Sequence, residues 1–456
     1  MLDALNEIAF HPAFEHTRIE KERRAVLAEV QMMNTIEYRV DCKLLEALHW
    51  ENALGHRFPI GLEDQIHHWG GDVLKAFHKR WYFPANMTLY IVGDLEQSVE
   101  EVEALIQSSF GAEVAVPVEA DEAATAPAAL KQRHEQRPPV KHAFGTALDL
   151  ERGAPEGSQV APEARAAVFQ HSLLQLFSLS LYQKLLVRPV TTMEDLRRVI
   201  ISRLIISVLQ FRINARYAEA NPPFTSIEFD HSDSGREGCT VSSLTITAEP
   251  QEWRRALTVS MEEVRRLYAH GITPGELMRY KAALLRDSEQ LAEQAGSVPS
   301  IDNLDFVMES DILGHTVMDQ EQGHEALVAV ADFVTLEDVH AMGRDLLAYA
   351  AEYGMDPAQR QSPDGGVCTA LLACVPATVV AEGDSGQGQP VEHPFVITSA
   401  EIEAVLSAET GNVEATQDVD VPDRLVSEAR VAELVEQRAP SFVAVSDAAV
   451  DPVTGR

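Results

Sequence analysis

The sequence has few cysteines and no apolar run long enough to cross a bilayer. Its four cysteines form no CxxC pair and no zinc-finger spacing with histidine. They are Cys42, Cys239, Cys368 and Cys374. We expect them to be small core residues in a reducing compartment. The most apolar stretch, residues 199–211, is short and contains Arg203, so it predicts a buried helix and no membrane span.

Positive charge is also scarce. The 456 residues include 37 Lys and Arg against 71 Asp and Glu, which gives a formal net charge of −34. Such a surface repels nucleic acid and attracts cationic partners. Two interpretations stay open: the charge serves solubility alone, or it favours the binding of basic polypeptides.

The amino terminus carries no recognisable targeting segment. Residues 1–8 read as an acidic amphipathic helix, whereas a signal peptide is basic and then apolar, and a transit peptide is poor in acids. If the protein is imported into an organelle, we expect its address to lie outside this sequence.

Hydrophobic periodicity in residues 1–112 predicts mainly helices. A strand is expected at 87–92, where Gly93 closes it, and an amphipathic helix at 98–110, with Gly111 as its C-cap. The other expected helices cover 18–38, a second segment containing Leu44, Leu45 and Leu48, and 72–81.

The rest of the chain divides into three parts by composition. Residues 113–165, rich in Ala, Pro and Glu, predict a partly disordered linker, and 379–456 an acidic linker or tail. Residues 166–378 predict a second globular unit of the α+β class, a sandwich of helices on a sheet. Its expected helices are 173–186, 193–217, 250–270 and one opening at Thr273, and its expected strands are 226–229, 241–248 and 371–375.

The polar loop 230–239 contains serine, histidine and carboxylate side chains. A serine-hydrolase site would need these groups arranged in three dimensions, which proximity in sequence does not supply. We therefore favour a strand-connecting hairpin loop.

Two carboxylates, Glu22 and Glu29, lie seven residues apart in the predicted helix 18–38. Seven residues return to within about 20° of the same direction, and the two Cα atoms are about 10 Å apart along the axis. The two side chains therefore share a helix face but are too far apart to bind one metal directly. Such spacing is also common on solvated helix surfaces.

The string Glu22-Arg-Arg-Ala-Val-Leu-Ala-Glu29 resembles the helix that follows the zinc motif in inverzincins, peptidase family M16. The resemblance extends over about 5–110 and 165–376. It implies M16 α/β sandwich domains, the first incomplete, with 1–112 as the end of the catalytic domain. It also implies Glu29 as the third Zn²⁺ ligand and Glu22 as the acidic residue that supports activity. The strings that carry it are 20–42, 57–63, 81–94, 221–226, 231–239 and 313–320.

Within the family, these strings are most similar to a branch that acts in the chloroplast stroma. The resemblance implies a zinc metalloendopeptidase that removes basic transit peptides from imported precursors. It also implies polypeptide substrates, and possible partnership with a second M16 half or subunit.

The family's HxxEH motif, which supplies two His ligands and the general base, is missing from the 16 histidines of this chain. His11 and His16 have HxxxEH spacing, which places them on different helix faces. We therefore expect a fragment that is inactive alone. One alternative is a non-catalytic, M16-like substrate-binding or scaffold subunit. Another is a gene-model fragment with no stable fold of its own.

Overall fold

The structure is a computed structural model, and it describes residues 1–115, 140–217, 221–362, 366–381, 391–408, 413–418 and 426–437. Residues Met1–Thr416 form one compact unit and Gln417–Arg456 a second. In the described part of the second unit, α17 (Glu428–Gln437) is an amphipathic helix.

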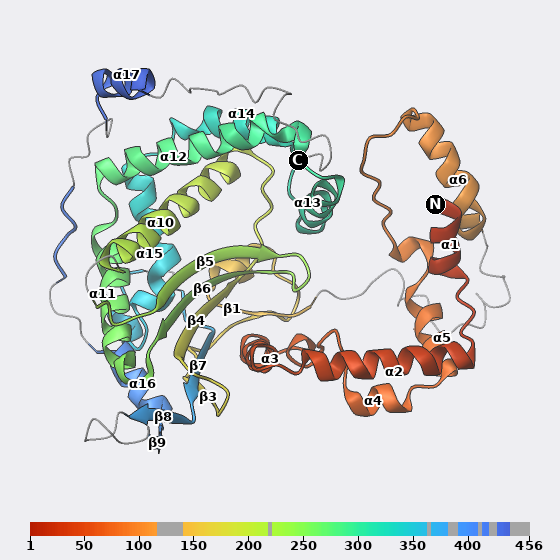
Figure 1. Cartoon of the computed structure of the whole chain (residues 1–456), viewed down its shortest axis with the longest axis horizontal. Helices are drawn as coiled ribbons and strands as arrows, with labels where there is room; N and C mark the ends of the chain where they lie inside the picture. Colours follow the sequence, from red (N-terminus) through yellow and green to blue (C-terminus); the bar gives the residue numbers. More distant parts are fainter. Residues whose placement is uncertain are drawn as a thin grey trace, which may run out of the picture. The chain divides into compact units, whose positions relative to one another are not determined.

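A five-stranded sheet forms the centre of the first unit (Figure 1). The strand order is β3-β7-β4-β6-β5, in which β3 pairs with β7 in parallel and the other neighbours are antiparallel. Central β4 aligns Leu181 with Leu244 on one side and with Leu371 on the other. The strands are β3 (Ala167–His171), β4 (Phe177–Leu185), β5 (Ser226–Ser234), β6 (Cys239–Ala248) and β7 (Ala370–Pro376). The predicted strands at 226–229, 241–248 and 371–375 are confirmed, and so is the α+β class.

The helix predicted at 173–186 is wrong, because these residues contain the central strand β4. Phe177, Leu179 and Leu181 alternate with more exposed side chains and are themselves fully buried. A period of two places all three on one face of a sheet.

Three long helices cover that face of the sheet (Figure 1). Leu204, Leu257 and Leu347, one from each helix, are completely buried in the shared core. The helices are α10 (Met193–Tyr217), α11 (Trp253–His270) and α15 (Leu336–Ala351). The helix expected at 193–217 is confirmed, and that at 250–270 is confirmed apart from its first turn, which is 3-10.

Two further helices, α12 (Pro274–Glu293) and α14 (Gln320–Ala331), pack against α10. Helix α13 (Ser300–Leu313) lies beside the turn between β5 and β6, where Glu309 accepts from the backbone N–H of Gly235. The predicted start of α12 is confirmed: the Thr273 side chain accepts from the Glu276 backbone N–H, and the Glu276 carboxylate accepts from the Thr273 backbone N–H.

The opposite face of the sheet packs against α3 (Ile36–Leu48), which contacts β7 and β3. The amino-terminal part is otherwise helical, with three errors of prediction. The segment 18–38, predicted as one helix, is divided, because one helix ends at Met33 and α3 begins at Ile36. Residues 87–92 form no strand, since a strand needs a pairing neighbour, and α6 (Val99–Ala115) continues past Gly111. The other helices are α1 (Leu2–Phe10), α2 (His16–Met33), α4 (Glu63–His68) and α5 (Gly71–Trp81).

The first compact unit includes elements in the segments expected to be linker and tail. In 113–165, the short parallel pair β1 (Ala143–Phe144) and β2 (Gln159–Val160) precedes β3, with α9 (Leu148–Glu151) between its strands. Beyond 378 lie β8 (Thr378–Ala381), β9 (Val391–Pro394) and α16 (Ser399–Leu406). Residues 116–139 are outside the described residues, and the four-part division stays a prediction. No helix in the described ranges is long and apolar enough to cross a membrane.

Candidate functional site

Helix α2 carries both predicted site residues and presents much of its surface to solvent. None of its residues is buried. Arg23 attaches it to α4, donating hydrogen bonds to the carbonyl oxygens of Ile66 and Trp69, and it also pairs with Glu20 at 3.0 Å. Carbonyl groups at the end of a helix lack partners within the helix, so a guanidinium is well suited to bind them.

A groove with a volume of about 680 Å³ lies between α2 and the segment that contains α4 and the start of α5. Its wall is largely apolar, with Phe14, Trp69 and Leu74 among the lining residues. Glu22 lines it as well. An extended peptide with apolar side chains fits a groove of this character.

The structure places Glu22 and Glu29 on one helix, as the sequence predicts, and both are exposed. Glu22 faces the groove, whereas Glu29 is not among the lining residues. Neither belongs to a group of three potential metal ligands within the described parts of the chain. These residues alone therefore do not fit a zinc ion, and the roles of Glu22 and Glu29 stay predictions.

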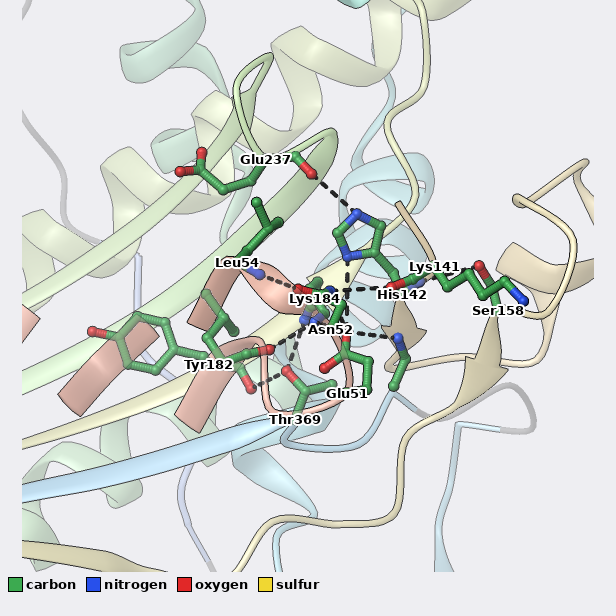
Figure 2. A network of polar contacts seen from close by, with 12 residues as sticks. Glu51, Asn52, Leu54, Lys141, His142, Ser158, Tyr182, Lys184, Glu237 and Thr369 are labelled. Carbon is green, nitrogen blue, oxygen red and sulfur yellow. Dashed lines mark hydrogen bonds and ion pairs between the residues drawn. The ribbon is translucent and has the colours of Figure 1, made fainter. Parts of the chain in front are cut away.

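A second cluster of functional side chains lies at the far end of α3 (Figure 2). His49 and Glu51 follow α3, and His142 directly precedes β1. The carboxylate of Glu51 accepts from Lys184 of β4 and from the backbone N–H of Ala143 at 3.0 Å. Its Oε1 is 3.8 Å from Nδ1 of His142.

Lys184 also donates to the carbonyl oxygen of Leu48 at 2.6 Å, so the end of α3 is bound directly to the sheet. Lys184 is three residues after Leu181 on β4, so its side chain lies on the opposite face of the sheet, where α3 packs.

Burial dominates the electrostatics of this cluster. It lowers the pKa of His49 to about 4, and the nearby positive charge of Lys184 acts in the same direction. The pKa of His142 is lowered by the same two causes. Burial also lowers the pKa of Lys184, against the opposing effect of its hydrogen bond to Glu51. Both imidazoles are therefore neutral at neutral pH.

The cluster was not predicted from the sequence, because it contains no HxxEH pattern. His49 and Glu51 form a short H-x-E spacing, a weak signal, and His142 lies 91 positions after Glu51. Only the fold brings that histidine to the other two side chains.

Comparison with known proteins places these features in a family. The model for the Peptidase M16 inactive domain matches residues 69–284. The chain is 46% identical over 478 residues to the chloroplastic stromal processing peptidase of Oryza sativa subsp. indica, and 47% identical over 481 residues to that of Arabidopsis thaliana. Each alignment covers 98% of this chain and 36% of the relative, so the chain spans about a third of the length of these relatives.

Solved structures support the fold. The periplasmic protease PqqL from Escherichia coli superposes with a TM-score of 0.64 at 15% identity, covering 92% of this chain and 40% of PqqL. At this identity the likeness concerns the fold alone. The plant relatives are chloroplastic by name, which supports a location in the chloroplast stroma. In sequence, the chain is similar to peptidase family M16 over residues 69–284 and to chloroplastic stromal processing peptidases over 98% of its length.

Proposed function

We propose that this chain is part of a zinc metalloendopeptidase that removes transit peptides from precursors imported into the chloroplast stroma. The observation that carries the proposal is the match to two stromal processing peptidases along nearly the whole chain. The groove beside α2 is consistent with it, because it offers an extended peptide an apolar wall next to Glu22.

In this proposal α2 forms one wall of the active site. Glu29 is a zinc ligand, and Glu22 orients the site or adjusts its charge. The remaining ligands are not in this sequence, because none of its 16 histidines lies in an HxxEH motif. They must come from protein outside these residues, in the same polypeptide or in a partner such as a second M16 half. The 456 residues alone are expected to be inactive.

The substrates would be basic polypeptides. A net charge of −34 attracts cationic segments over distances up to about a Debye length, roughly 10 Å at 0.1 M salt. Transit peptides are rich in Arg and poor in acids, so they have the complementary charge.

Binding of a fluorescent, arginine-rich transit peptide, followed by anisotropy, tests this proposal on the 456-residue chain. We expect saturable binding that weakens as salt is raised, and that is reduced in Trp69→Ala, which removes part of the groove wall. Trp50→Ala is the matched control, because Trp50 is similarly exposed but does not line the groove. Absence of binding, or equal loss in both variants, would contradict a substrate site in this groove.

A second candidate function is a non-catalytic, M16-like subunit that binds substrate or acts as a scaffold. The absence of HxxEH favours it. The genomic sequence before Met1 separates the two candidate functions. In-frame codons that encode an HxxEH motif support the peptidase, whereas a genuine start codon with no such motif before it supports the subunit.

A further inference from the structure

Three side chains of the types that bind transition metals converge beside the sheet. His49, Glu51 and His142 each offer one ligand atom, and these atoms all lie within 4.8 Å of one another. They form the one such group found in the described ranges of the chain. Figure 2 shows Glu51 and His142 converging from separate segments.

The convergence leaves several buried polar atoms without a hydrogen-bond partner. They are both ring nitrogens of His49, Nδ1 of His142 and Oε2 of Glu51. The side chains are nearly inaccessible: His49 is 1% exposed, His142 2% and Glu51 6%. Because buried polar groups almost always have partners, unpaired atoms on three neighbouring side chains indicate a missing ligand.

The hydrogen bond on the far side of His142 fixes which nitrogen is free. Its Nε2 is 3.0 Å from the backbone oxygen of Glu237. A carbonyl oxygen only accepts, so Nε2 carries the proton and Nδ1 presents its lone pair toward Glu51. Histidine ligands of metals characteristically have this arrangement, in which the second nitrogen donates to a carbonyl or carboxylate.

We propose that His49, Glu51 and His142 form a binding site for a divalent metal ion of the zinc class. Two imidazole nitrogens and one carboxylate oxygen are a donor set that zinc accepts, with water in the fourth position. Glu29, the zinc ligand of the proposed function, is not part of this set. The site would join the end of α3 to the start of β1.

Lys184 is a cation that competes with a metal ion for the carboxylate of Glu51. Its ammonium group contacts Oε1 of Glu51. A metal ion at the same carboxylate is repelled by the nearby ammonium, so the charge of Lys184 opposes metal binding. Removal of the ammonium should therefore strengthen metal binding, whereas an ordinary structural ion pair has no such effect.

The test uses the tag-free 456-residue chain after treatment with a chelator, with circular dichroism as a check of folding. Zinc affinity is measured by competition with a chromogenic chelator, and Co²⁺ absorption reports the donor atoms. We expect one equivalent of zinc to bind, and a tetrahedral cobalt spectrum without a thiolate band. His49→Gln and His142→Gln should each weaken binding by more than about tenfold.

Two further variants complete the test. Lys184→Met should bind zinc more tightly than the natural chain and regain thermal stability when zinc is added. His324→Gln, which changes a half-buried histidine on α14 outside the cluster, should bind zinc normally. The proposal is overturned if the folded natural chain binds no zinc, which would leave ordered water as the partner of the unpaired atoms. Zinc binding by His49→Gln and His142→Gln as tight as that of the natural chain would overturn it as well.

Discussion

Lys184 of β4 and Glu51 of the segment after α3 form an ion pair whose side chains are 1% and 6% exposed. The two residues are 133 positions apart in sequence, so the pair joins the amino-terminal helices to the central sheet. Buried charges are strongly destabilising when one partner is removed, because the other stays uncompensated.

We therefore predict that Lys184→Met lowers the free energy of unfolding of the metal-free chain by about 3–5 kcal/mol. Chemical denaturation in the presence of a chelator measures it. Lys43→Met is the control: Lys43 pairs with Glu46 at 2.7 Å on the surface, and the expected loss is about 0–1 kcal/mol. Equal stability of the two variants would contradict the buried pair.

A second prediction concerns acid stability at a buried pair. Arg212 of α10 binds Glu276 through two hydrogen bonds, of 2.9 and 2.7 Å. Burial raises the pKa of Glu276, but the hydrogen bonds from Arg212 and Thr273 outweigh this effect and hold the pKa below its usual value. The carboxylate therefore contributes stability that is fully present above the usual pKa and is lost as pH falls through the lowered one.

Denaturation of the natural chain between about pH 6 and pH 3 should show this loss, and Glu276→Gln should show a flatter dependence on pH with lower stability at neutral pH. Glu228→Gln, at an exposed position on β5, is the control and should follow the natural chain. A pH dependence in Glu276→Gln as steep as that of the natural chain would count against the role of this pair.

A third prediction tests the central strand. Leu179 is fully buried on β4, so Leu179→Ala should cost about 2–5 kcal/mol of stability by loss of burial and creation of a cavity. Leu173→Ala, in the exposed turn before β4, should change stability by less than about 0.5 kcal/mol. Thermal unfolding of both variants checks the contrast, and similar losses would show that β4 is assigned wrongly.

The wrong prediction for β4 shows which secondary structure could be predicted from the sequence and which could not. The long periodic helix 193–217 and the hairpin strands at 226–229 and 241–248 follow from pattern alone. In β4, a short apolar run is compatible with both helix and strand, and its alternation of Phe177, Leu179 and Leu181 was the signal for a strand. Residues 87–92 show the reverse case, because a strand-like pattern without a pairing neighbour forms no strand.

The two candidate sites also differ in whether they could be predicted from the sequence. Glu22 and Glu29 could be placed on one helix from their spacing, because helical geometry is local. The cluster of His49, Glu51 and His142 depends on packing between distant segments. No local pattern marks His142, whose position beside Glu51 is set by the packing of β1 against β4.

The most direct test of the proposed function is zinc-dependent hydrolysis of a basic transit peptide. It compares the 456-residue chain with a chimera in which a segment carrying the family's HxxEH motif is fused before Met1. We predict no hydrolysis by the chain alone, and chelator-sensitive hydrolysis by the chimera. Glu29→Gln should abolish this hydrolysis, whereas Glu46→Gln, at a half-buried position on α3, should not. Chelator-sensitive hydrolysis by the chain alone, or a chimera that stays active with Glu29→Gln, would contradict the account.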